Sequence, residues 1–237
     1  MRPSSPTPHK GVHVWQLMLA EHASSHSLCQ SVFSADEQER AARFHFEEHR
    51  NDFLIARAFL RTVLGAYLKI EPAAVQFVYN EFGKPSVPAG PENNLFFNLS
   101  HSNHVALLAV TRETEVGVDI EQIRSIEPGL AERYFSATEI RALQQLPKDL
   151  YQEGFFNCWT RKEAYIKARG KGLSLPLDKF DVSLAPGQPA RMLQIRDSED
   201  QASSWQLAHL TPARGFVGAV AMRSNNLNLT MLNFESF

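Results

Sequence analysis

A short pattern that occurs twice constrains the fold of this chain more than any other feature. Phe33-Ser-Ala-Asp-Glu37 in the first half corresponds to Phe135-Ser-Ala-Thr-Glu139 in the second half, 102 residues further on. In both, a serine is followed three residues later by a glutamate, which is the capping box that begins a helix. The segments 104–112 and 216–223 are also similar. Chance similarity between amphipathic elements is the alternative, but the order of the predicted elements favours a duplication.

Each half predicts a strand, a capped helix, a second helix and then further strands. The first half predicts a strand over 12–20, a helix over 35–68 broken near 49–52, and strands over 77–79, 95–99 and 105–111. The second half predicts strands over 116–120, 180–184, 192–196, 205–210, 216–222 and 229–234, with a helix over 151–168. We expect an α+β fold of two similar α/β halves related by a pseudo-two-fold axis, with the active site in the cleft between them.

The expected organisation is a disordered tail over 1–10, an N-terminal half over 11–113 and a C-terminal half over 114–237. A net charge of −2 argues against bulk electrostatic binding to nucleic acid or to an anionic membrane. The two cysteines form no CxxC pair, and no apolar run approaches the length of a membrane helix. We therefore expect a cytoplasmic protein. Because its two halves are similar, we expect a monomer built as a pseudo-dimer.

Two carboxylates define the first candidate site. Asp119 and Glu121 stand two residues apart at the end of an apolar strand, so both point to one face. Carboxylates this close repel each other unless a cation or a proton neutralises them, and hard oxygen ligands suit Mg²⁺. The alternative is a solvated strand end.

The predicted helix over 151–168 carries the second candidate. Trp159, Glu163 and Lys167 recur every four residues and share one helical stripe. The alternative is a surface pair of Glu163 and Lys167 worth about 0.3 kcal/mol, with Trp159 in the core. The leucines of the glycine-bounded segment 170–177, Leu173 and Leu175 among them, need either the core or a binding partner.

A third candidate combines Gly83-Lys-Pro85 with Phe97-Asn-Leu-Ser-His-Ser102. Gly83 and Pro85 fit a tight turn, and Lys84, Ser100 and His101 offer groups suited to a phosphate. A hairpin turn followed by a surface histidine is the alternative.

Taken in order along the chain, these motifs resemble the 4′-phosphopantetheinyl transferase superfamily, in its larger surfactin-synthetase-activating (Sfp) type. The resemblance rests on the third candidate's two motifs, Val116-Gly-Val-Asp-Ile-Glu121, Phe135-Ser-Ala-Thr-Glu139, and Trp159-Thr-Arg-Lys-Glu-Ala-Tyr-Ile-Lys167 with the segment 170–177 after it. It covers residues 33 to 184. It implies Mg²⁺-dependent transfer of the 4′-phosphopantetheine group of coenzyme A to a serine of an apo acyl or peptidyl carrier protein, releasing 3′,5′-ADP. Such carriers serve fatty acid, polyketide or nonribosomal peptide biosynthesis.

The resemblance also implies residue roles. Asp119, Glu121 and Glu163 match the magnesium ligands, Glu163 also matches the base for the carrier serine, and Lys167 matches the lysine on the pyrophosphate. Together these make Asp119, Glu163 and Lys167 the expected catalytic residues. The expected coenzyme A contacts, mostly in the N-terminal half, are Arg40, Lys84, Pro85, Ser100, His101 and Lys167. Glu37 stands where some members of the family have a second basic residue. The C-terminal half is expected to hold the metal and to dock the carrier. The segment 170–177, with Leu173 and Leu175, is expected to form part of the docking surface.

Two other functions use the same residues. A magnesium-dependent phosphohydrolase or nuclease would need the three carboxylates, although a nuclease is expected to present a more basic face. A non-catalytic carrier-protein binding module is expected to have lost a metal ligand or Lys167, and this chain retains all of them.

Overall fold

The structure is a computed structural model that describes residues 10–22, 30–88, 90, 94–196 and 200–237. The tail predicted over 1–10 lies outside the described residues except for Lys10. Within these ranges, the chain has no helix of the length and apolar character needed to cross a bilayer.

Among the described residues, the first half contains two α-helices and five strands. Its helices are α1 (Ala35–Ala42) and α2 (Glu47–Leu68), and its strands are β1 (Val12–Met18), β2 (Val78–Tyr79), β3 (Pro85–Ser86), β4 (Phe96–Ser102) and β5 (Val105–Thr111). The helical stretch breaks at 43–46, earlier than the expected 49–52. The polar cluster over 49–52 instead lies in the first turns of α2. The negative charges of Glu47 and Glu48 stabilise this helix start, because the N-terminal end of a helix carries a partial positive charge. Phe44 packs on Phe53 across the break, with ring centroids 5.4 Å apart.

In the part of the second half that the structure describes, there are three α-helices and six strands. Its helices are α3 (Leu130–Tyr134), α4 (Ala137–Gln144) and α5 (Tyr151–Arg169), and its strands are β6 (Val116–Gln122), β7 (Phe180–Val182), β8 (Met192–Ile195), β9 (Trp205–Leu210), β10 (Phe216–Arg223) and β11 (Leu229–Asn233). Helix α3 was not predicted, because five residues are too few to show a helical period.

The order of strands is the same in both halves. In the first sheet β1 pairs with β5 and β5 with β4; in the second, β6 pairs with β10 and β10 with β9, and all four pairings are antiparallel. This repeated order supports the expected pair of similar halves. One strand crosses over, because β11 pairs in parallel with β1 and extends the first sheet.

Both capping boxes are present, and the glutamate of each box also forms a buried ion pair with a cation on the following long helix. Glu37 accepts a hydrogen bond from the Nε atom of Arg61 of α2 at 2.7 Å, and Glu139 lies 2.7 Å from the ammonium of Lys162 of α5. The two cations also donate to backbone carbonyls that follow their helices, at 72, 75, 177 and 180. Glu37 therefore has a structural role in this chain. The duplication extends to buried polar groups that the motifs alone do not reveal.

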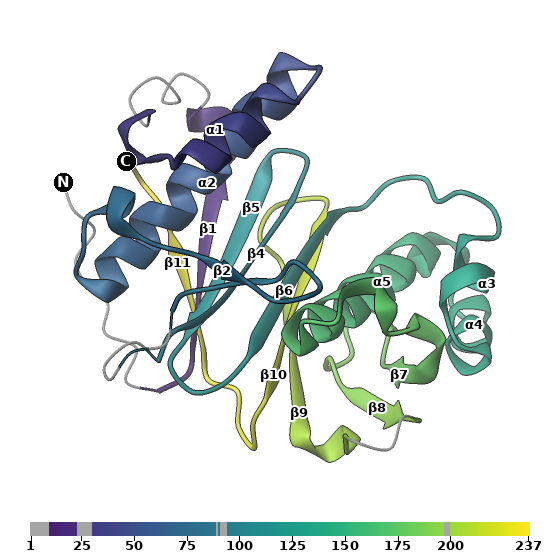
Figure 1. Ribbon diagram of the computed structural model, residues 1–237. Helices are drawn as coiled ribbons and strands as arrows, with labels where there is room; N and C mark the ends of the chain where they lie inside the picture. The colour runs from purple at the N-terminus through teal and green to yellow at the C-terminus, as the bar shows by residue number, and fades with distance from the viewer. Residues whose placement is uncertain (1–9, 23–29, 89, 91–93, 197–199) are drawn as a thin grey trace.

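The two sheets meet at the centre of the molecule, with α2 on one side and α5 on the other (Figure 1). Apolar residues of β1 and β5 pack with those of β6, β9 and β10 in a single core cluster. Separate clusters lie beneath α2 and around α5. The junction between the halves is therefore a packed core, and residues that line it are held rigidly.

Candidate active site

The edges of the two sheets meet where β4 lies beside β6, and side chains join them. The N–H of Val118 donates to Asn98 Oδ1 at 2.8 Å, and the N–H of Gln122 donates to Ser102 Oγ at 3.2 Å. Side chains thus satisfy backbone groups that a continuous sheet would pair. This seam places polar residues of one half against the strand of the other half that carries the two candidate carboxylates.

Asp119 and Glu121 both face β4, as the alternation along the strand predicts. Ser100 donates to Asp119 Oδ1 at 2.9 Å, and Ser102 donates to Glu121 Oε2 at 3.0 Å. Asp119 is buried, and its second oxygen, Oδ2, has no hydrogen-bond partner among the described residues. A buried carboxylate oxygen without a partner is costly, so this atom is a candidate for binding a cation.

Lys167 reaches the same point from the last turn of α5. Its Nζ atom lies 2.5 Å from Asp119 Oδ1 and 3.0 Å from Ser100 Oγ. The expected alternative was a surface pair of Lys167 with Glu163. In the described part of the chain, the ion pair of Lys167 is with Asp119 instead. A serine, a carboxylate and an ammonium from three elements therefore converge at the junction of the halves.

Glu163 lies one helical turn before Lys167 and is partly buried. Burial, together with the negative charges of Asp119 and Glu121, raises the pKa of Glu163 to about 7, although the positive charge of Lys167 opposes the shift. Burial and the charge of Asp119 also raise the pKa of Glu121. Within the described ranges no three acidic, histidine or cysteine side chains are arranged closely enough to form a complete metal site. The repulsion among these carboxylates favours a proton or a cation.

Helix α5 lies very close to β6, and this close packing fixes the distance of Glu163 and Lys167 from the β4–β6 seam. A Cβ atom added to Gly117 would lie 2.0 Å from the carbonyl oxygen of Ala164 and 2.4 Å from the nitrogen of Ala168. Only glycine permits this approach. Two turns before Lys167 on the same stripe, Trp159 packs at ring-centroid distances of 5.3 Å and 6.1 Å from Tyr134 and Phe155, as the core interpretation of that residue predicts.

Lys84 and Pro85 lie on the β2–β3 hairpin, where Pro85 pairs with Tyr79. The ammonium of Lys84 contacts the carboxylate of Glu115, the carbonyl of Ala168 at 3.0 Å and the carbonyl of Val116 at 3.5 Å. A lysine has three N–H donors, and these contacts occupy all of them. A phosphate would therefore bind Lys84 only by replacing one of the three.

Arg40 and His101 lie on separate elements. Arg40 is exposed on α1, with its guanidinium 5.3 Å from the centre of the Phe53 ring. Desolvation lowers the pKa of His101, the charge of Asp52 on α2 raises it, and the charge of Lys167 lowers it. The imidazole of His101 is therefore close enough to both α2 and α5 for a charge on each helix to shift its pKa. No contact within the described residues joins Arg40 to this group.

The leucines that follow α5 correct one expectation. We expected Leu175 in an exposed carrier-docking loop, but Leu175 is 7% exposed and Leu177 is 4% exposed, both within the core cluster around α5. The loop folds back under the helix, which allows the carbonyl of Leu177 to accept from Lys162. The side chain of Leu173 lies outside the described part. The core interpretation therefore holds for Leu175 and Leu177.

Sequence reasoning missed Asn98 and Ser102, which form the seam, and Asn80, which contacts the end of α5. The signal for the first two was available. Asn98, Ser100 and Ser102 alternate along one strand, so their polar side chains share one face. No local pattern marks Asn80.

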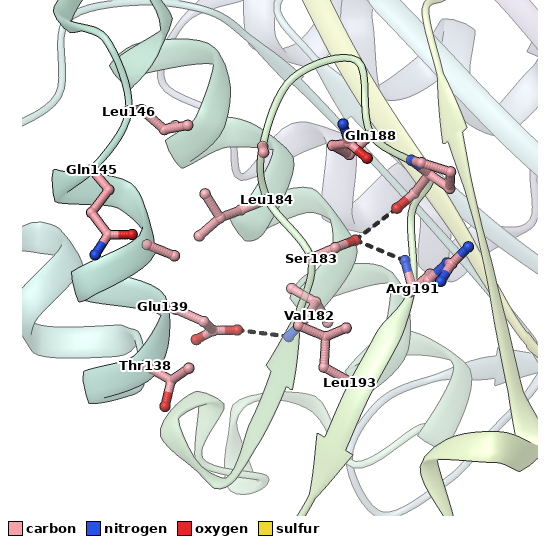
Figure 2. A pocket seen from close by; sticks show the side chains of 13 residues that line it. Thr138, Glu139, Gln145, Leu146, Val182, Ser183, Leu184, Gln188, Arg191 and Leu193 are labelled. Atoms are coloured by element: carbon pink, nitrogen blue, oxygen red, sulfur yellow. Dashed lines mark hydrogen bonds between the residues drawn. The ribbon is translucent and has the colours of Figure 1, made fainter.

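A pocket of about 480 Å³ lies elsewhere, between α4 and the β7–β8 hairpin. Figure 2 shows Glu139 of α4 directed at the backbone of Val182, whose N–H donates to it at 2.8 Å. Ser183 is likewise satisfied, because it donates to the carbonyl of Pro189 and accepts from the N–H of Arg191. The polar groups at the base of this pocket are used in structural hydrogen bonds. The candidate site residues Ser100, Asp119 and Lys167 lie instead at the β4–β6 seam.

Comparison with known proteins identifies the class. Residues 15–113 match the profile of the 4′-phosphopantetheinyl transferase N-terminal domain, and residues 115–221 match that of the 4′-phosphopantetheinyl transferase superfamily. The 4′-phosphopantetheinyl transferase HetI of Nostoc sp. is 39% identical over 214 residues, 89% of this chain and 87% of the relative. Sfp of Bacillus subtilis is 35% identical over 65% of this chain and 67% of its own length. A phosphopantetheinyl transferase of Thraustochytrium sp. is 26% identical over 86% of this chain and 76% of its own.

The chain belongs to the 4′-phosphopantetheinyl transferase superfamily. Its relatives include Sfp itself, which confirms the resemblance to the Sfp type. The chain is therefore an enzyme of the phosphopantetheinyl transferase class.

Proposed function

We propose that this enzyme moves the 4′-phosphopantetheine group of coenzyme A to a serine of an apo acyl or peptidyl carrier protein, requires Mg²⁺, and releases 3′,5′-ADP. The observation that carries the proposal is the convergence of Asp119, Ser100 and Lys167 at the seam, beside a glutamate whose pKa is about 7. Phosphoryl transfer needs neutralisation of charge and removal of a proton more than it needs covalent help.

The three carboxylates at the seam offer the hard oxygen ligands that suit a magnesium ion, and they would have to draw closer together to enclose one. Asp119 Oδ2 is buried without a hydrogen-bond partner among the described residues, and burial together with the charge of Asp119 raises the pKa values of Glu121 and Glu163. A cation bound by these three carboxylates would relieve both penalties. When bound, Mg²⁺ would supply a positive charge that offsets the negative charge of the pyrophosphate oxygens.

The chain's own residues suit the remaining roles. A bond forms between the serine oxygen of the carrier and the phosphorus attached to pantetheine, and the bond from that phosphorus to the leaving 3′,5′-ADP breaks. Glu163 accepts the serine proton, since a base with a pKa near 7 has both the right charge and driving force at neutral pH. Lys167, anchored by Asp119 and Ser100, presents its ammonium to the developing charge.

We propose that coenzyme A spans the junction. Its expected contacts are Arg40, Lys84, Pro85, Ser100, His101 and Lys167, of which Ser100 and Lys167 already touch each other. The carrier would dock mainly on the C-terminal half. We propose that the enzyme acts as a monomer. We also propose that it acts in the cytoplasm, where coenzyme A and carrier proteins are both available.

Intact-mass measurement of a panel of apo carrier proteins tests this function. Incubation with the enzyme, coenzyme A and Mg²⁺ should add one phosphopantetheine group to at least one carrier, with 3′,5′-ADP formed in equal amount. Chelation of the metal should stop the reaction, and a carrier with serine replaced by alanine should stay unmodified. If coenzyme A is cleaved without a carrier, the enzyme is a phosphohydrolase. Carrier binding without a change of mass would indicate a binding module.

A further inference from the structure

One amide side chain closes the tip of the β2–β3 hairpin. Asn80 follows β2 directly, and its Oδ1 atom accepts hydrogen bonds from the N–H groups of Phe82 at 3.0 Å and Lys84 at 2.8 Å. The carbonyl of Asn80 also accepts from the N–H of Gly83, which has a φ of +81° that suits glycine. The oxygen of the Asn80 side chain is thus committed to the turn of its own hairpin.

The other end of the same amide reaches the second half. Asn80 Nδ2 donates to the carbonyl of Gly170 at 2.8 Å, and Gly170 caps α5 in the left-handed conformation with φ +64°. The approach is close, because a Cβ added to Gly170 would lie 3.1 Å from Asn80 Nδ2 and 3.1 Å from Lys84 Cδ. Lys84 adds a second bond, to the carbonyl of Ala168. The last carbonyls of a helix lack partners inside the helix, and here the hairpin supplies them.

These bonds lie within three residues of Lys167. Helix α5 is also held against β6, by the contact of Gly117 with Ala164 and Ala168. The Nζ atom of Lys167 must nevertheless reach Ser100, which belongs to β4 of the first half. The hairpin is also part of the first half, so it ties the last turn of α5 to the half that carries Ser100.

We propose that Asn80 is a positioning residue for Lys167. Its amide clamps the hairpin turn to the cap of α5 and thereby holds the ammonium of Lys167 within hydrogen-bond reach of Ser100 and Asp119. The inference rests on the proposed function, in which Lys167 acts on the pyrophosphate. Asn80 acts on the reaction only through Gly170 and the backbone of α5.

The substitution Asn80→Asp tests the bond to Gly170 separately from the bonds that close the hairpin turn. The aspartate keeps an oxygen for the N–H groups of Phe82 and Lys84, but it places an acceptor instead of a donor against the carbonyl of Gly170. We expect kcat to fall about tenfold while the KM values for coenzyme A and carrier change by less than about twofold, because Lys167 is displaced without loss of a substrate contact. Asn80→Ser is the uncharged test, since its hydroxyl suits the turn and is too short for the clamp.

Asn94→Asp is the matched control. Asn94 also donates from Nδ2 to a backbone carbonyl, that of Arg112 at 3.1 Å, but this bond joins two segments of the first half. The same change of charge at Asn94 should leave kcat unchanged. A clamp that serves stability alone would lower the melting temperature of the Asn80 variants and leave kcat per folded enzyme at the wild-type value.

Hydrogen exchange gives a readout that does not need activity. Backbone amides over 166–170 should exchange faster in both Asn80 variants than in the wild type, while those of β5 remain unchanged. Normal kcat in both Asn80 variants, or a raised KM with normal kcat, would overturn the positioning role. If the wild type transfers nothing, the proposed function fails, and the exchange of 166–170 still decides whether the clamp exists.

Discussion

The ammonium of Lys167 lies 2.5 Å from Asp119 Oδ1, across the junction between α5 and β6. The side chain of Asp119 is 5% exposed and that of Lys167 is 28% exposed. The pair is therefore partly shielded from water, and each charge stabilises the other more than on a surface. The first prediction concerns the removal of this ammonium.

Lys167→Ala should lower kcat by about 10² or more, since a charge that stabilises the transition state is lost. Lys167→Arg should restore part of the rate, because a planar guanidinium cannot place a point charge where the ammonium stood. Stability should fall by about 1–2 kcal/mol, since Asp119 loses a charged partner. Steady-state kinetics of carrier modification measure the effect, with Lys148→Ala as an exposed control. Near-normal turnover in Lys167→Ala would make the lysine structural.

Asp119→Asn should reduce transfer by about 10² or more, because the substitution keeps the shape and removes the charge that would hold both Mg²⁺ and Lys167. Asp149→Asn, on the surface before α5, is the control for the same change. Activity is measured over a magnesium titration with folding checked by circular dichroism. Unchanged activity in the folded Asp119→Asn protein would remove Asp119 from the metal site.

The pKa of Glu163, about 7, predicts how activity depends on pH. Because a base acts only when deprotonated, kcat/KM for the carrier should rise with pH and level off above about 7, and bound Mg²⁺ should move this midpoint lower. A flat profile between about pH 5.5 and about pH 8 would exclude Glu163 as the base.

The same shift predicts a dependence of stability on pH. The folded pKa lies above the ordinary value of 4.5, so the folded state holds the proton more tightly than the unfolded state does. In metal-free protein, the contribution of Glu163 to the unfolding free energy should therefore fall as pH rises from about 4.5 to about 7. Urea unfolding of the wild type and of Glu163→Gln in chelator tests this. The variant should lose that part of the slope, and identical slopes would contradict the shift.

The two buried ion pairs, Arg61 with Glu37 and Lys162 with Glu139, predict unequal losses of stability when the cation is removed. Lys162→Met leaves the carboxylate of Glu139 buried without its cation and removes a donor from the carbonyls of Leu177 and Phe180. We expect a loss of about 3–5 kcal/mol. Arg61→Met should cost less, because Arg57 also contacts Glu37 at 2.7 Å. Denaturant unfolding measures both, and a loss below about 1 kcal/mol for Lys162→Met would show that the pair contributes little.

Leu175→Ala should destabilise the protein by about 2–4 kcal/mol, as expected for truncation of a buried leucine. The KM for the carrier should stay within about twofold of the wild-type value once the variant is folded, because the side chain lies in the core around α5. Leu193→Ala, at a leucine that is 54% exposed, is the control for stability. A selective rise in the KM for the carrier would return Leu175 to the docking surface.

Much of the fold follows from local patterns. The two capping boxes place the starts of α1 and α4, since a serine and a glutamate three residues apart satisfy free N–H groups wherever the helix lies. The alternation of β6 places Asp119 and Glu121 on one face for an equally local reason. Helix α3 and the break at 43–46 escaped prediction, because short segments depend on what they pack against.

The sequence by itself determined the duplicated order of elements and the face on which each candidate residue stands, because periodicity acts over a few neighbouring residues. Tertiary structure alone decided the partners. Lys167 pairs with Asp119, Leu175 enters the core, and the ammonium of Lys84 turns to Glu115 and the end of α5. In each case the same side chain could pair its charge with several different partners, or bury its apolar surface at several different sites. The choice depends on which distant segments the packed junction brings within a few ångströms, and no local pattern encodes that distance.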